Sequence, residues 1–308
     1  MNKIFSVPGG ITDHVTLVDA VTLLYSEKRD LFLDDIEIGC VYDSFSGVWS
    51  GGRAFNINKQ QDYSVIKDTI QKFNDRGIGF RQIFTNLFIH EHLEDERCNT
   101  IMDLLSNGVN NSVVLASDTA FSVLKERYPN LTFGSSVIKG LYSKDLIIEE
   151  LNKEYDDVCI WHKFNTVEFL GDLNTDLKSK ITLLTNQICN PSCDRMYLCG
   201  LRASIFMLEQ YNIDVPQKYK TLDRWCPQEK AAERSGRVTT AKELFSLPWV
   251  LTNEKIRELS EIGITRFKIT GRNGYFYSEE LLKVFLYYLV KPCFYEDFIK
   301  EITDIVNK

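Results

Sequence analysis

Short apolar segments alternate with segments of helical periodicity along the whole chain. Strands are expected where apolar and β-branched residues follow one another between Gly, Pro, Asn or Asp residues. These segments are residues 3–7, 36–42, 79–87, 112–116, 131–138, 157–161, 180–185 and 264–270. The helical pattern covers residues 13–27, 62–76, 93–107, 119–127, 144–154 and 165–171, and an amphipathic helix over residues 278–290 closes the series.

The order of these segments predicts a single α/β barrel. Strands that alternate with helices form parallel sheets, and eight such units in one chain of this length favour a TIM-type (β/α)8 barrel over an open sheet. The sequence has no G-x-G-x-x-G after its first strand and no Walker loop, which argues against a nucleotide-binding open sheet. We therefore expect one domain over residues 1–308. Residues 196–251, between strands seven and eight, are expected to form a helical insertion over the catalytic face.

Composition narrows the class of protein further. The chain has 308 residues, with 36 Lys and Arg against 43 Asp and Glu, for a net charge of −7. This balance argues against bulk nucleic-acid binding but is compatible with a local basic site. No apolar run reaches about 18 residues, so no helix is expected to span a bilayer. The first residues lack the pattern of a signal peptide, and we expect a cytoplasmic protein whose cysteines are thiols or metal ligands.

The densest chemistry is a cysteine cluster just beyond the seventh strand. Cys189, Cys193 and Cys199 are spaced C-x3-C-x5-C, and Cys226 lies in the expected insertion. Residues beyond the carboxyl end of a barrel strand lie on the catalytic face. Thiolates suit zinc or iron–sulfur centres, and four of them complete a [4Fe–4S] cluster. Zinc and ordinary buried thiols remain alternatives. The other four cysteines are isolated in the sequence and are expected to be structural: Cys40, Cys98, Cys159 and Cys293.

Several motifs resemble those of peptidase family U thirty-two (U32), the collagenase-like family that includes the ubiquinone-biosynthesis proteins UbiU and UbiV. The most specific is GITRFKITGR over residues 263–272, and the second is the cysteine loop, where LLTNQIC over residues 183–189 precedes Cys193 and Arg195. Two further segments carry the resemblance toward the N-terminus: GGRA over residues 51–54 and RYPNL over residues 127–131.

The resemblance implies a fold, a cofactor and a range of activities. It implies a TIM-type barrel and a [4Fe–4S] cluster held by Cys189, Cys193, Cys199 and Cys226. It also implies oxygen-independent hydroxylation of a quinone precursor or RNA base, or modification of a peptide, rather than plain proteolysis. No G-x-S-x-G or H-E-x-x-H motif supports a protease. Two alternatives stay open: a non-catalytic, metal-stabilised subunit that pairs with a homologue, and a zinc hydrolase or peptidase.

Other candidate site residues follow the expected strand ends. Lys268 and Arg272 end the eighth strand, where barrels often bind anions, and Arg53 could close on the same small anionic or polar substrate. His14 and His162 follow the first and sixth strands and are candidate proton donors. Two further residues, Asn186 and Arg195, flank the cysteine loop and are expected to contact substrate.

Overall fold

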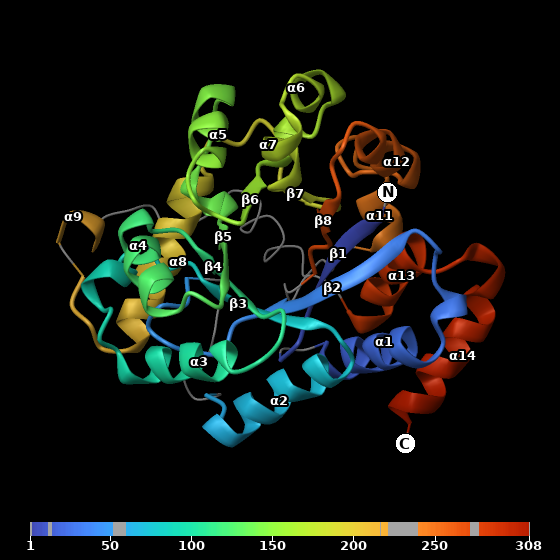
Figure 1. Ribbon diagram of the computed structural model, residues 1–308, viewed down its shortest axis with the longest axis horizontal. Helices are drawn as coiled ribbons and strands as arrows, with labels where there is room; N and C mark the ends of the chain where they lie inside the picture. The colour runs from blue at the N-terminus through green and yellow to red at the C-terminus, as the bar shows by residue number, and fades with distance from the viewer. Residues whose placement is uncertain are drawn as a thin grey trace.

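The parallel barrel closes on itself. The computed structural model describes residues 2–11, 14–51, 60–215, 217–220, 240–271 and 277–307. Its eight strands pair in chain order, each parallel to the next, and the last pairs with the first (Figure 1). Helices surround this ring of strands (Figure 1). The TIM-type (β/α)8 barrel expected from the sequence is confirmed.

All eight strands lie where the hydrophobic pattern predicts them. They are β1 (Lys3–Pro8), β2 (Ile36–Asp43), β3 (Gly79–Phe84), β4 (Ser112–Leu115), β5 (Thr132–Ser135), β6 (Asp157–Ile160), β7 (Ile181–Leu184) and β8 (Arg266–Lys268). Six of them, β3 to β8, end earlier than predicted, and β3 and β5 do so by three residues. β3 stops at Phe84. β5 stops at Ser135 because Ser136 begins a 3-10 turn, η4 (Val137–Lys139), and its Oγ accepts a hydrogen bond from the Ile138 N–H.

The helices follow the same order. Those between β1 and β7 are α1 (Val15–Glu27), α2 (Tyr63–Asp75), α3 (Glu96–Ser106), α4 (Asp118–Arg127), α5 (Lys144–Leu151), α6 (Val167–Gly171) and α7 (Thr175–Ser179). After β7 come α8 (Met196–Gln210), α9 (Gln217–Lys220), α11 (Ala241–Phe245) and α12 (Asn253–Glu261), and after β8 come α13 (Ser278–Leu289) and α14 (Tyr295–Val306). Side-chain caps begin several of them, as at Asp95 and Thr166.

Polar side chains occupy part of the barrel interior. Cys40 of β2 donates to Ser6 of β1, with Sγ and Oγ 3.2 Å apart. Arg81 of β3 pairs with Asp157 of β6. The apolar core lies mainly between the outer side of the strands and the helices, where Phe5, Val7 and their equivalents are buried. The interior is therefore held by specific polar contacts as well as by apolar packing.

Helix α8 follows β7 in sequence but contacts loops on another part of the barrel. Its Ser204 Oγ accepts a hydrogen bond from the Leu87 N–H, just after β3. Tyr211, which ends the helix, has its hydroxyl 3.3 Å from Ser46 Oγ, just after β2. Gly200 packs against Ile138 in η4, after β5. All three partners follow the carboxyl ends of strands, so α8 lies on the carboxyl-terminal side of the barrel.

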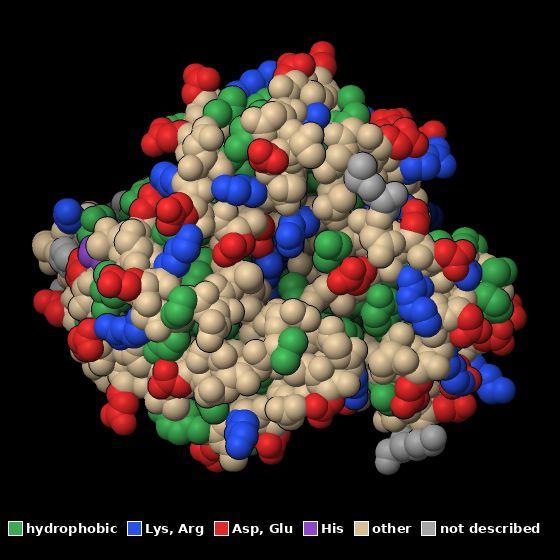
Figure 2. Space-filling model, viewed as in Figure 1, with side chains coloured by type: hydrophobic (Ala, Val, Ile, Leu, Met, Phe, Trp, Pro, Cys, Tyr) green, Lys and Arg blue, Asp and Glu red, His purple; other side chains and the backbone are tan. Residues whose placement is uncertain are grey.

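The surface carries charged side chains of both signs. Acidic and basic side chains are interspersed over the face that Figure 2 shows. In the part of the chain that the structure describes, no helix is long and apolar enough to cross a membrane.

Candidate functional site

The cysteine loop connects β7 to α8 at the carboxyl end of the barrel. Cys189 and Cys193 on this loop and Cys199 in the first turn of α8 are all half-buried. The Cys193 N–H donates to the Asn190 carbonyl at 3.0 Å, and the Cys199 N–H donates to the Arg195 carbonyl at 2.9 Å in the first turn of α8. Both thiols therefore sit on local hydrogen-bonded turns, on the face where barrel active sites are built.

Two tryptophans hold this loop by its backbone. Trp161, directly after β6, donates its indole N–H to the Pro191 carbonyl at 3.0 Å. Trp249, which precedes α12, donates to the Gln187 carbonyl at 2.8 Å. The Trp161 ring is buried and the Trp249 ring is half-buried, and each indole N–H makes one hydrogen bond to the loop backbone. The loop is thus fixed at positions on either side of Cys189.

Asn186 joins the ends of β7 and β8. Its amide group donates to the Thr270 carbonyl at 2.9 Å and accepts from the Thr270 N–H at 2.6 Å. Thr270 Oγ1 in turn donates to the Asn186 carbonyl at 3.0 Å. The Asn186 side chain, expected to contact substrate, is engaged in this exchange and fixes where the cysteine loop leaves the barrel.

His162 lies beside the cysteine loop and is buried. The residue is only 4% exposed. The centroid of its ring lies 4.0 Å from the ring centroid of Trp161 and 6.4 Å from that of Trp249. Neither ring nitrogen makes a hydrogen bond of good geometry with the described residues. Burial lowers the pKa of His162 to about 4, although the nearby Cys189 backbone acts in the opposite direction. The imidazole is therefore neutral at pH 7.

Tyr142, in the segment after η4, contacts the start of α8 next to the cysteine loop. Its hydroxyl accepts a hydrogen bond from the Tyr197 N–H, in the first turn of α8, at 2.8 Å. Burial raises the pKa of Tyr142, and the negative charges of Cys193, Cys199 and Asp194 raise it further. The Tyr197 N–H acts against that increase. The Tyr142 hydroxyl therefore lies at the first turn of α8, directly after the cysteine loop.

Lys268 of β8 lies against Tyr42 of β2. Its Nζ is 4.0 Å from the centroid of the Tyr42 ring, and the Tyr42 hydroxyl donates to the Ile269 carbonyl at 2.7 Å. Tyr42 itself packs with Ile83 and Val114 inside the barrel. Burial raises the pKa of the interior Cys159 to about 11, and the charge of Lys268 opposes that increase. Lys268 therefore points toward the barrel interior, as its position in the strand predicts.

The remaining predicted site residues have different surroundings. His14 is buried, and its Nδ1 lies 3.0 Å from Ser278 Oγ at the start of α13. Arg195 directly precedes α8 and supplies the carbonyl that Cys199 binds. Arg53, Cys226 and Arg272 lie outside the described residues.

The donor atoms present suit a soft metal, but they are not gathered into a finished centre. Three half-buried thiols, on the loop after β7 and in the first turn of α8, are the ligand type that iron–sulfur clusters and zinc select. Among the described residues, no three His, Cys, Asp or Glu side chains are close enough together to hold a metal ion. The donor type therefore suits the cluster that the motifs imply, but the described residues do not bring three such donors together.

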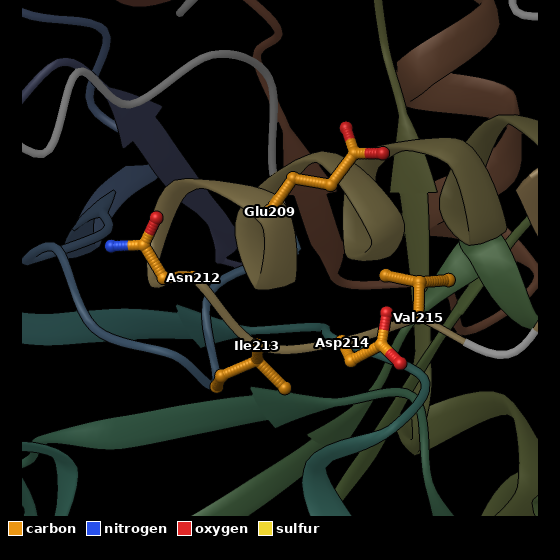
Figure 3. A pocket seen from close by; sticks show the side chains of 5 residues that line it. All are labelled: Glu209, Asn212, Ile213, Asp214 and Val215. Atoms are coloured by element: carbon orange, nitrogen blue, oxygen red, sulfur yellow. The ribbon is translucent and has the colours of Figure 1, made fainter.

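A cavity at the far end of α8 is a separate feature. It has a volume of about 360 Å³ and is lined by Glu209, Asn212, Ile213, Asp214 and Val215. The side chains of Glu209 and Asp214 come from the helix and from the segment after it (Figure 3). None of the predicted site residues lines this cavity, and its two carboxylates make it unsuited to an anionic substrate.

Sequence reasoning missed the aromatic residues that hold the cysteine loop. Trp161, Trp249 and Tyr142 are far from the cysteines in sequence, and none belongs to a motif. Trp161 carried one usable signal, because it is the last residue of a predicted strand and hence lies at the barrel mouth. Tyr142 and Trp249 lie in irregular segments, and no local pattern indicates their role.

These observations define a (β/α)8 barrel protein with a cysteine-bearing loop at the carboxyl-terminal mouth of the barrel. The solved structure of the U32 peptidase Mk0906 has a similar fold, with a TM-score of 0.50 and 14% sequence identity over 88% of this chain and 93% of that chain. At this level of identity the likeness shows the fold, and it agrees with the U32 resemblance of the motifs at that level. No protein-family model and no curated protein matches the sequence.

Proposed function

We propose that the chain holds a [4Fe–4S] cluster at the mouth of its barrel and modifies a small anionic or polar substrate there. The observation that carries the proposal is the position of Cys189, Cys193 and Cys199, which are all half-buried and lie on the loop after β7 and in the first turn of α8. Active sites of (β/α)8 barrels are built from such loops. Cytoplasmic thiols of this spacing suit a cluster better than a disulfide framework.

The cluster would be held by these three cysteines and Cys226. When bound, a four-cysteine cluster supplies one-electron transfer. The chain's own residues supply binding and orientation. Lys268, directed toward the barrel interior beside Tyr42, would attract the anionic group of the substrate, together with Arg53 and Arg272. Trp161 and Trp249 fix the loop, and Asn186 fixes its origin at the ends of β7 and β8.

The proposed reaction class follows the family resemblance. It is an oxygen-independent hydroxylation, or a related modification, of a small molecule, an RNA base or a peptide. The same fold in the U32 peptidase Mk0906 is compatible with this class. A buried, neutral His162 beside the loop is compatible with hydrogen bonding to a bound ligand rather than with fixing an anion.

Metal analysis of anaerobically purified protein tests this proposal directly. We expect iron and acid-labile sulfide in equal amounts and a broad absorbance near 400 nm. Changing Cys189, Cys193, Cys199 or Cys226 singly to Ser should abolish or reduce the absorbance. Changing the exposed Cys293 to Ser should not alter it, because Cys293 lies after α13 and away from the loop in sequence.

Two results would contradict the proposal. Zinc without iron would favour a zinc hydrolase or a structural zinc site. Protein that contains neither metal, and that takes up neither during anaerobic reconstitution, would rule out a metal centre at these cysteines.

A further inference from the structure

Buried polar atoms without a hydrogen-bond partner gather around β6 and β7. Three side chains that are more than nine-tenths buried carry such atoms among the described residues: His162, Asn165 and Thr182. His162 begins the 3-10 turn η5 (His162–Phe164) just beyond β6, Asn165 ends that turn, and Thr182 lies in β7. Because nearly all buried polar groups in native proteins are paired, three incomplete ones in one sector of the barrel indicate a place where a ligand completes them.

The orientation of the Asn165 amide is fixed by β7. Its Nδ2 donates to the Leu184 carbonyl at 3.1 Å. A carbonyl only accepts, so the amide nitrogen must lie on this side and Oδ1 on the other. Oδ1 is buried and meets no donor in the part of the chain that the structure describes. The group that completes Asn165 must therefore supply an O–H or N–H.

His162 offers a second incomplete group on the same turn. The Asn165 N–H donates to the His162 carbonyl at 3.2 Å. The two indoles beside the imidazole, Trp161 and Trp249, already donate their N–H groups to the backbone of the cysteine loop. The nearby Cys189 backbone can engage only one ring nitrogen, so the other remains for a ligand.

Thr182 extends this set toward the proposed anion site. It pairs in register with Cys159 of β6, and Leu184, two residues further along β7, pairs with Lys268 of β8. Side chains alternate along a strand, so Thr182 and Leu184 share the inner face on which Lys268 lies. Asn165 binds the carbonyl of this same Leu184. The uncharged groups therefore lie one strand away from Lys268.

We propose that His162, Asn165 and Thr182 form an uncharged subsite that binds hydroxyl groups of a small substrate. A hydroxyl supplies the donor that Asn165 Oδ1 requires, and it also accepts from an imidazole or threonine donor. Because all three residues are nearly fully buried, the ligand is enclosed, which favours a small molecule over a peptide or an RNA chain. The inference rests on the proposed function for the anionic group at Lys268, so the substrate carries both an anionic group and a hydroxyl.

The stability of the ligand-free protein gives the first test. A buried polar atom without a partner destabilises a fold, so an apolar isostere at that position should stabilise it. We expect Thr182→Val and His162→Phe to raise the urea midpoint of the full-length protein. Thr22→Val is the matched control, because Thr22 is also buried but its Oγ1 donates to the Val18 carbonyl at 2.8 Å. Its midpoint should fall.

Binding of small acids gives the second test. Titration calorimetry on full-length, anaerobically purified protein compares glycolate, 3-hydroxypropionate and 4-hydroxybutyrate with acetate, propionate and butyrate. We expect at least one hydroxy acid to bind roughly 10-fold more tightly than the acid of equal chain length, the effect of one or two hydrogen bonds. His162→Phe and Thr182→Val should each reduce this preference. His90→Phe should retain it, because His90 is exposed and follows β3.

The outcomes separate this inference from the proposed function. Midpoints that fall in both Thr182→Val and His162→Phe, as in Thr22→Val, would show that enclosed water already pairs these atoms, and would overturn the subsite. Equal or undetectable binding of the hydroxy acids and the plain acids by the wild type would also overturn it, even in protein that holds iron. Iron-free protein that still prefers a hydroxy acid would overturn the proposed cluster and leave the subsite standing.

Discussion

Arg81 of β3 and Asp157 of β6 form an ion pair inside the barrel, with Nη2 and Oδ2 2.7 Å apart. Both side chains are buried, at 10% and 4% exposed, and Arg81 Nε also donates to Ser112 Oγ on β4 at 2.8 Å. Burial acts to lower the pKa of Arg81, but Asp157 and the nearby Cys40 outweigh it, so that its pKa is raised. The pair links strands that are not neighbours in the sheet.

Removing one member of this pair should strongly destabilise the barrel. In Asp157→Ala the guanidinium stays buried without its carboxylate, and we expect the free energy of unfolding to fall by about 3–5 kcal/mol. Urea denaturation followed by circular dichroism measures this loss. Asp35→Asn is the control, because Asp35 pairs with Lys3 at the surface with its side chain 54% exposed, and we expect a change of at most about 1 kcal/mol. Equal losses in the two variants would contradict this account of the buried pair.

Gly134 makes room for the same carboxylate. A Cβ at Gly134 would lie 2.7 Å from Asp157 Oδ1, so Gly134→Ala should displace Asp157 and cost about 1–3 kcal/mol. Gly171→Ala is matched to it, because nothing lies within 4 Å of a Cβ at Gly171, and we expect no loss of stability there. Thermal unfolding of the two variants side by side gives the comparison. A loss confined to Gly171→Ala would show that the approach to Asp157 is unimportant.

An ionic network behind β5 should make the fold sensitive to acid. Lys139 and Lys153 each contact both Asp118 and Glu150, and Ser135 Oγ donates to Glu150 Oε1. Burial would raise the pKa of Asp118, but the hydrogen bonds from the two lysines lower it to about 2, and the pKa of Glu150 is lowered by the same partners.

The direction of the pH effect follows from these lowered values. Both carboxylates stabilise the fold above their ordinary pKa values of about 4. The contribution of Asp118 is lost as the pH falls from about 4 to about 2, and that of Glu150 is lost as the pH falls through its lowered pKa. Asp118→Asn should be less stable at pH 7 and should lose less on acidification through that range. Asp34→Asn removes an exposed carboxylate whose pKa is lowered by Lys291 at the surface, and we expect it to change the pH profile much less than Asp118→Asn does. Denaturant midpoints measured from pH 7 to pH 2 test both expectations.

The indole clamp, formed by the hydrogen bonds from Trp161 and Trp249 to the cysteine loop, should matter for metal retention more than for folding. Trp249→Phe removes the N–H that binds the Gln187 carbonyl, which should cost about 0.5–1.5 kcal/mol in stability. Because the clamp positions the cysteine loop, we also expect roughly 10-fold weaker Co²⁺ binding, the size of effect typical for residues that support metal ligands. Competition with a chelating dye measures the affinity.

Trp49→Phe separates the effect on stability from the effect on Co²⁺ affinity. Trp49 donates to the His92 carbonyl at 2.7 Å, between the loops after β2 and β3, so its loss should reduce stability but leave Co²⁺ affinity unchanged. If Trp249→Phe bound Co²⁺ as tightly as the wild type, the indole hydrogen bond would have no role in positioning the cysteines.

The hydrophobic pattern was sufficient for the barrel because each strand is buried on its outer face by the helices next to it in sequence. Residues such as Phe5, Phe80 and Phe133 lie in short apolar runs, and these runs mark all eight strands. The pattern was less reliable at strand ends. At Ser136 a side-chain hydrogen bond competes with the sheet and ends β5. The hydrophobic pattern does not indicate such a hydrogen bond.

The candidate site was partly visible in the sequence. Three of its cysteines share one loop, so their spacing alone indicates a common chemistry. Lys268 alternates with apolar neighbours in a strand, which indicates a side chain directed into the barrel. The contacts of Lys268 and of the cysteine segment could not be predicted. Tyr42 contacts Lys268 from β2, and Tyr142 contacts the start of α8 from the segment after η4.

The sequence by itself determined the number, order and type of the repeating units, because strand and helix periodicity are local properties of the chain. It also determined which residues carry thiol, imidazole and charged side chains. The tertiary structure decided which of them meet. Closing the barrel brings Arg81 to Asp157, and the course of α8 over the carboxyl-terminal loops brings Tyr197 to Tyr142. These contacts join residues dozens of positions apart, and strand register and helix packing, which no local pattern encodes, set their geometry.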